Sequence, residues 1–306
     1  AATTFKLGVL APEGTNWATN LKKMAKEIKE KTNGEVKLRI YFGGSQGDEP
    51  YVLRKIRIGQ LQGGIFTGKT LGELNGDIRV MEIPFTFNDD RQKALETLRK
   101  MTPFFNKGLN ESGFVNLGFY EIGMVYFISQ VKTPDLKSLK GLKIWSWEGD
   151  ELVSTMIDTM GLVSVPLALP DVLSSLSTGV IKAAYAPPLG ILSLQWHTKV
   201  KYLVDLPLSY SVGAMLIDKR KWKKLSEEHQ KLIRKIADKY VNRVNEGNIE
   251  DNKKALQAIR STVEFIEFSE KDQKLGKEYR KEVVKKLKGD LFSKEALKRL
   301  NKHLKD

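Results

Sequence analysis

The stretch 31–42, KTNGEVKLRIYF, decides the fold because it joins the end of a helix to the start of a strand. The Asn-Gly pair at 33–34 is a typical helix end. Apolar residues then occupy every second position from Val36 to Phe42, which predicts a half-buried strand. A helix, a tight turn and a strand in this order are typical of α/β domains, so the stretch predicts that class.

The flanking segments extend this pattern in both directions. Residues 4–10 alternate as a strand, and a helix with one apolar face follows the turn at 12–14. A glycine-rich loop at 43–47 precedes a second predicted helix, and 64–67 is predicted to be a short buried strand. The resulting strand-helix-strand-helix-strand order predicts a largely parallel sheet.

The remaining chain repeats this style and adds a long helix. Residues 115–120 and 125–131 are predicted as two long strands, and 142–145 as a shorter one. Ser226 is placed to cap a helix whose apolar spacing continues towards Ile259. At 306 residues, the chain is long enough for two domains of ordinary size.

The composition bounds the class of protein. Hydrophobic residues make up 41% of the chain and charged residues 29%, which is typical of a globular protein. No apolar window is long enough to predict a membrane-spanning helix. Because the chain contains no cysteine, disulfides, thiolate zinc sites and cysteine nucleophiles are excluded.

The formal net charge is +14, and the excess lies mainly in the C-terminal third, for example at 219–224 and 281–288. Glutamates are interleaved with these lysines, so a solvated helix face is the plain interpretation. A weak association with an anionic membrane is the alternative. Binding to nucleic acid is not indicated, because no basic-aromatic pattern of a known nucleic-acid module is present.

Several motifs, in order over nearly the whole chain, resemble those of the solute-binding proteins of tripartite ATP-independent periplasmic (TRAP) transporters. The segment 139–145, LKGLKIW, is similar to a family strand that reads LKGLKIR. Each motif is modest alone, but their order makes the resemblance strong. The other matching segments are KTNGEV at 31–36, GGSQGDE at 43–49, IPFTF at 83–87, LSSLSTGVI at 173–181 and WKKLSEEHQ at 222–230.

The resemblance implies a periplasmic-binding-protein-like α/β fold, with two α/β lobes, a ligand cleft and a long helix that spans both. The expected first lobe is 1–123 plus 208–250, and the expected second lobe is 124–207 plus 251–306. In such receptors the ligand is trapped as the cleft closes.

The resemblance also implies a function. It indicates an extracytoplasmic solute receptor that works in the periplasm and delivers a small molecule to the membrane subunits of a TRAP permease. It implies no enzymatic activity and no cofactor. Any signal peptide is expected to have been removed ahead of Ala1.

Positions that carry polar ligand-binding groups in the family are apolar here. Val125 stands in place of one arginine, and Trp145 replaces the arginine that clamps the ligand carboxylate. Ala186 replaces an asparagine. A carboxylate moved out of water without a paired cation loses several kcal/mol of solvation, whereas covered apolar surface contributes about 25 cal/mol per Å². These departures predict a hydrophobic or aromatic ligand rather than a dicarboxylate or a sugar acid.

The predicted ligand-binding residues combine these positions with aromatic and apolar neighbours. The two-residue period of a strand places Trp145 and Trp147 on one side. Core packing is the alternative interpretation for Trp145 and for Trp17, and Phe66 could instead face the interior of the sheet. The predicted set is Trp145, Trp147, Val125, Ala186, Tyr185, Phe66, Trp17 and Leu169.

The sequence leaves two other functions open. A monocarboxylate could be held by a relocated cation, Lys182 or Lys69, and a membrane-associated lipid shuttle could use the basic surface. Catalysis and metal binding are not indicated, because His197, His229 and His303 show no ligand-like spacing.

The segment 63–70, GGIFTGKT, fits the P-loop pattern. A P-loop needs a strand before its first glycine and a helix after its Lys-Thr pair. Here the preceding residues 51–62 have a helical period and the apolar strand lies inside the motif. Nucleotide binding is therefore rejected.

Overall fold

The chain divides into two units in the computed structural model, which describes residues 2–306. The first unit comprises 2–75, 102–121 and 212–249, and the second comprises 76–101, 122–211 and 250–306. Elements with residues in both units are α4 (Arg91–Glu111), β4 (Phe114–Ser129), β9 (Ser209–Asp218) and α9 (Glu227–Arg260).

The segment 76–101 lies in the second unit, whereas the sequence-based boundaries assign it to the first lobe. Hydrogen bonds explain this placement. The Asp77 carboxylate accepts from the Ser293 amide at 2.7 Å and from the Ser293 hydroxyl at 3.0 Å. The Phe85 amide donates to the Leu208 carbonyl at 2.9 Å. These partners are distant in sequence, so no local pattern identifies them.

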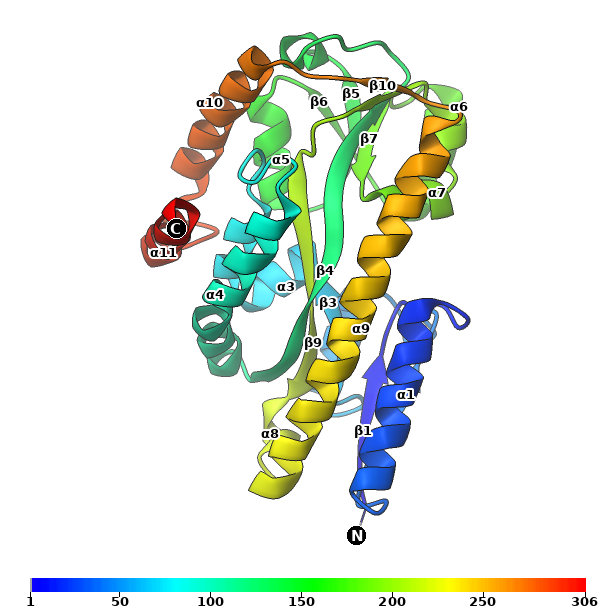
Figure 1. The fold of residues 1–306 in the computed structure, drawn as a ribbon, viewed down its shortest axis with the longest axis vertical. Helices are drawn as coiled ribbons and strands as arrows, with labels where there is room; N and C mark the ends of the chain where they lie inside the picture. Colours follow the sequence, from blue (N-terminus) through cyan, green and yellow to red (C-terminus); the bar gives the residue numbers. More distant parts are fainter. Residues whose placement is uncertain (1) are drawn as a thin grey trace. The chain divides into compact units, whose positions relative to one another are not determined.

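The first unit contains the predicted alternation of strands and helices. In its sheet, β1 pairs in parallel with β2 and β3, and β3 pairs antiparallel with β9. Figure 1 labels β1, β3 and β9. The other elements of the unit are β1 (Thr3–Gly8), α1 (Asn16–Lys31), β2 (Val36–Tyr41), α2 (Glu49–Arg57), β3 (Gly63–Thr67), α3 (Gly68–Leu74) and α8 (Lys219–Trp222).

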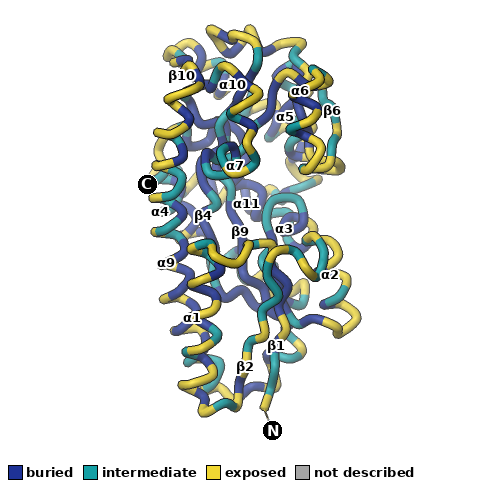
Figure 2. The backbone as a smooth tube through the Cα atoms, turned by 90° about the vertical axis from the view of Figure 1, so that its right-hand side faces the viewer, coloured by how far each residue is buried: buried dark blue, intermediate teal, exposed yellow. Residues whose placement is uncertain are grey.

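Local sequence explains where α1 begins and which face it buries. The Thr15 hydroxyl accepts a hydrogen bond from the Ala18 amide at 3.1 Å, which caps the first turn. Leu21, Met24 and Ile28 are buried, and their spacing places them on one face. Figure 2 shows the same alternation of buried and exposed residues along α1 and α9.

The second unit has a sheet in the order β4-β7-β5-β6, in which β5 is parallel to both neighbours and β4 is antiparallel to β7. Short strand β8 pairs with β4 and β10. The elements are η1 (Gly76–Glu82), η2 (Leu136–Leu139), β5 (Lys143–Trp147), α5 (Glu151–Thr159), β6 (Val163–Leu167), η3 (Leu169–Asp171), α6 (Val172–Thr178), β7 (Ala183–Ala186), α7 (Pro188–Ser193), η4 (Trp196–Lys199), β8 (Tyr202–Val204), β10 (Glu264–Ile266), α10 (Glu270–Leu287) and α11 (Lys294–Lys305).

Strand β4 is continuous, whereas the sequence predicts two strands separated near Gly123. Gly123 has a φ of 140°, which side chains rarely tolerate. A Cβ there would lie 2.7 Å from the Asn252 side-chain nitrogen. Asn252 itself donates to the Ile122 carbonyl and accepts from the Leu189 amide, both at 3.0 Å. A glycine therefore lets the strand pass close to α9 without interruption.

The structure confirms the predicted mixed α/β class and the long helix, whose capping Ser226 hydroxyl accepts from the His229 amide at 3.1 Å. Residues 63–67 of the P-loop-like motif form β3 itself, as expected, although a short helix does follow. None of the helices described within residues 2–306 is both long enough and apolar enough to cross a membrane.

Candidate functional site

Trp145 lies on β5 in the core of the second unit. Its side chain is 4% exposed, and its indole nitrogen donates to the Leu167 carbonyl on β6 at 3.0 Å. The indole is thus fixed by its own sheet and packed among apolar side chains such as Ile181 and Val172. This placement agrees with the alternative interpretation of Trp145 as a core residue, and it leaves little of the ring for a ligand in this conformation.

Three aromatic side chains surround Trp145. Tyr185 stacks on it with a centroid distance of 4.8 Å and an interplanar angle of 22°. Trp147 lies at 5.7 Å, on the side that strand alternation predicts. Trp196 contacts it edge-on at 5.4 Å and was missed by the sequence analysis. Trp147 is 38% exposed, so it offers the most accessible surface of this cluster.

The Tyr185 hydroxyl is buried and forms no hydrogen bond within normal geometric limits. Burial raises its pKa, and the Asp150 carboxylate adds to this increase, whereas the Trp147 backbone and the Arg79 guanidinium oppose it. The phenol is therefore neutral over the physiological range. Its hydroxyl is a donor and acceptor available to a polar group that approaches it.

A buried ionic cluster lies close enough to Tyr185 to affect the pKa of its phenol. Arg79 on η1 is 4% exposed, and its guanidinium lies 2.8 Å from the Glu82 carboxylate and 3.2 Å from that of Asp150. Burial alone would lower the pKa of Arg79, but the two carboxylates outweigh it and raise the pKa. With two acids for one base, this arginine is already compensated and is a poor anchor for a ligand carboxylate.

The remaining predicted residues of the second unit differ in whether they pack against the core that contains Trp145. Ala186, at the end of β7, is half-buried and packs against the core that contains Trp145, as does Leu169 on η3. Val125 is buried on β4, where its carbonyl accepts from the Leu208 amide at 2.7 Å. Val125 is not part of that core.

Phe66 and Trp17 belong to the first unit. Phe66 is fully buried on β3, opposite Ala214 of β9, so its ring faces the interior in this conformation. Trp17 is half-buried on α1, and its ring centroid lies 4.8 Å from that of Tyr120. A role of either residue in ligand binding stays a prediction.

The relocated cations proposed from the sequence lie outside the aromatic cluster. Lys182 is exposed just before β7, with its ammonium near Gly179. Lys69, in the first unit, forms an ion pair with Glu73 at 3.2 Å. Across residues 2–306 no group of three or more histidines, cysteines or acids is arranged to hold a metal ion.

Comparison with known proteins gives a consistent result. Residues 7–290 match the model of the DctP family, described as bacterial extracellular solute-binding protein, family 7. A solute-binding protein of Chromohalobacter salexigens is 28% identical over 71% of this chain, although the match spans 65% of that protein's length. The 2,3-diketo-L-gulonate-binding periplasmic protein YiaO of Escherichia coli is 24% identical, with 87% of this chain and 81% of that protein covered.

Solved structures show the same fold. A TRAP periplasmic solute-binding protein from Desulfovibrio salexigens, with bound orotic acid, superposes with a TM-score of 0.88 at 21% identity, covering 99% of this chain and 98% of that one. A second TRAP periplasmic solute-binding protein, from Haemophilus influenzae with bound L-gulonate, gives a TM-score of 0.85 at 21% identity. The match covers 98% of this chain and 99% of that one.

Proposed function

Because the chain belongs to family 7 of the bacterial extracellular solute-binding proteins, as its motifs predict, we propose that it is a periplasmic receptor for a hydrophobic or aromatic small molecule. It delivers this molecule to the membrane subunits of a TRAP permease. The single observation that carries the ligand class is the stacked Trp145 and Tyr185 pair at the position where the family has its carboxylate-clamping arginine.

The ligands of similar solved proteins differ from the ligand proposed for this chain. The similar solved proteins hold orotic acid, D-glucuronate, L-gulonate or sn-glycerol-3-phosphate, all of which are anionic. A receptor for such ligands needs charged or polar donors that offset the lost solvation of the anion. In this chain the Trp145 N–H is already bonded to Leu167 and the Arg79 charge is already matched by carboxylates.

The proposed contact surface consists of the less buried members of the cluster. Trp147 supplies an exposed indole face, and Tyr185, Ala186 and Leu169 supply half-buried surface beside it. Trp145 contacts the Tyr185 and Trp147 rings and supports both from within the core. Covering such surface stabilises a complex by about 25 cal/mol per Å² of apolar area, and the Tyr185 hydroxyl adds one polar contact.

A direct test uses isothermal calorimetry and thermal shift with a defined panel. The panel contains phenylacetate and a long-chain monocarboxylate as acids with a large apolar part, and succinate and galacturonate as strongly hydrated acids. We expect saturable binding of one or both largely apolar acids and none of the hydrated acids. Tight binding of succinate or galacturonate would contradict the proposed ligand class while leaving the receptor class intact. Native mass spectrometry of the purified protein then identifies any small molecule that co-purifies.

The monocarboxylate alternative has its own test. If a relocated cation holds the acid group, Lys182→Ala or Lys69→Ala should abolish the binding of phenylacetate. If neither substitution changes its affinity, the acid group is not held by these lysines.

A further inference from the structure

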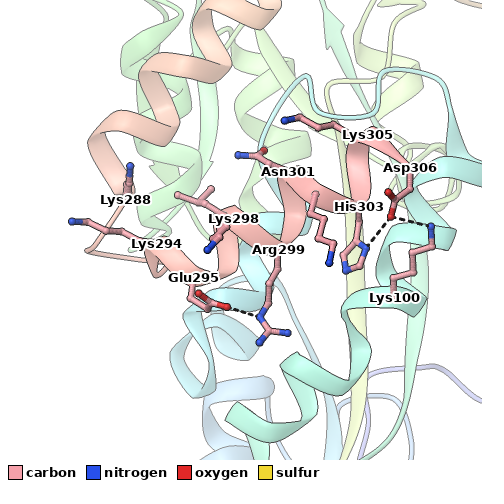
Figure 3. A pocket seen from close by; sticks show the side chains of 12 residues that line it. Lys100, Lys288, Lys294, Glu295, Lys298, Arg299, Asn301, His303, Lys305 and Asp306 are labelled. Atoms are coloured by element: carbon pink, nitrogen blue, oxygen red, sulfur yellow. Dashed lines mark hydrogen bonds and ion pairs between the residues drawn. The ribbon is translucent and has the colours of Figure 1, made fainter.

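A broad groove with a volume of about 1050 Å³ lies on the second unit, away from the aromatic cluster. Its walls are α11, the residues that follow α10 and the Lys100 side chain of α4 (Figure 3). The lining is strongly charged. We name it the α10–α11 groove and define its basic residues as Lys288, Lys294, Lys298, Lys302 and Lys305.

The charge of the α10–α11 groove is not balanced by its own acids. Glu295 pairs with Arg299 at 2.9 Å, and Asp306 lies 3.8 Å from Lys100 and 3.6 Å from His303. These pairs are the dashed contacts in Figure 3. Among residues 2–306, the five lysines that define the groove form no ion pair. They therefore present uncompensated positive charge to whatever enters it.

The positive surface continues along α10. A smaller adjoining groove of about 570 Å³ shares Lys288, Lys294 and Asn301 with the first and extends to Arg280. The Arg280 side chain donates through Nε to the Thr86 hydroxyl at 2.8 Å, whereas its Nη2 is buried without a hydrogen-bond partner. Burial lowers the pKa of Arg280, and no carboxylate offsets this cost. The smaller groove thus extends the row of cations from Lys288 to Arg280.

The fold itself gains little from this charge pattern. Ala296, Leu297 and Leu300 are the residues of α11 that pack in the core, whereas Lys294, Lys298 and the other lysines are exposed. Like charges spaced by one helical turn, such as Lys294 and Lys298, destabilise an isolated helix slightly. The arrangement is therefore better explained by an external partner than by the stability of the chain.

We propose that the α10–α11 groove docks an acidic segment of a partner protein. Its hollowed lining favours a narrow occupant such as a peptide segment over a flat bilayer. Its lining also lacks the exposed aromatic side chains that anchor proteins at membrane interfaces. Carboxylates on an extended or helical segment match a row of lysine ammonium groups. This inference is independent of the ligand proposed above.

The test measures the anisotropy of a fluorescent Glu- and Asp-rich peptide of about twelve residues, long enough to follow a groove. A Gln- and Asn-rich peptide of equal length is the neutral probe. We expect the acidic peptide alone to bind, with an affinity that falls as ionic strength rises. Lys294→Glu, Lys298→Glu and Lys302→Glu combined should weaken binding about tenfold or more.

The control variant carries Lys23→Glu, Lys231→Glu and Lys235→Glu, which change the net charge equally at exposed positions of the first unit. It should retain most of the affinity for the acidic peptide. An equal loss in this control would reduce the effect to net charge and overturn the proposal. No salt-sensitive peptide binding, or tighter binding to vesicles of phosphatidylglycerol that the groove variant abolishes, would also overturn it. Should the groove variant fail to fold by circular dichroism, the Lys→Gln versions replace it.

Discussion

The phenol ring of Tyr185 stacks on the indole of Trp145, with centroids 4.8 Å apart and planes inclined by 22°. The pair joins β7 to β5 across the sheet of the second unit and closes one face of the indole. The hydrogen bond from Trp145 to the Leu167 carbonyl holds the same ring from β6. The side chain that replaces the family's arginine is thus a structural support as well as part of a proposed site.

Trp145→Ala should destabilise the protein by about 3–5 kcal/mol, because it leaves a large cavity in a close-packed core. Urea unfolding monitored by circular dichroism measures the change. Trp147→Ala is the matched control, since that indole is 38% exposed, and it should cost less than about 1 kcal/mol. Equal costs for the two substitutions would show that Trp145 does not support the core.

Trp147→Ala should instead weaken the binding of an apolar ligand. Loss of its contact area should lower the affinity for phenylacetate, or for the panel ligand that binds best, about tenfold. Tyr51→Ala serves as the control because it removes another exposed aromatic ring, which lies in the first unit. Isothermal calorimetry measures both. An unchanged affinity in the Trp147 variant would remove that residue from the ligand site.

Local patterns predicted the elements well, including the strand that carries Trp145. The alternation of 36–42 predicted β2, and the period of β5 predicted that Trp145 and Trp147 lie together. The order of motifs predicted the family. These features depend on short stretches of sequence, where spacing alone fixes which side a residue faces.

Features that depend on distant partners were not predictable in this way. Trp196 follows a short helix and meets Trp145 only through the fold. Asp150 has the signature of a helix cap, and its carboxylate does accept from the Val153 amide at 3.2 Å, but the same side chain also pairs with Arg79.

The Arg79 cluster gives a third prediction. Arg79→Met should cost about 3–5 kcal/mol, because the buried carboxylates of Glu82 and Asp150 would lose the guanidinium that pairs with both of them. Adding Glu82→Gln and Asp150→Asn should recover part of this loss, since it removes the two negative charges that Arg79 had compensated. The control is Lys22→Met, which breaks an exposed pair with Glu13 and should cost less than about 1 kcal/mol. A cost for Arg79→Met as small as that of the control would show that the cluster is solvated.

The Tyr126 phenol should make the protein less stable at high pH. Burial raises the pKa of Tyr126 to about 12, with Asp205 and Asp89 adding to the increase and Arg260 opposing it. In the unfolded chain a tyrosine ionises near pH 10. The contribution of Tyr126 to stability is therefore complete below about pH 10 and is lost as the pH rises towards 12, because the unfolded state releases its proton first.

Tyr126→Phe should flatten this decline in urea unfolding measured across that range, whereas Tyr51→Phe, which removes an exposed phenol, should leave it unchanged. A decline as steep in Tyr126→Phe as in the unmodified protein would assign the loss to other groups, among them the buried Tyr185 and Tyr120, whose pKa values burial shifts in the same direction.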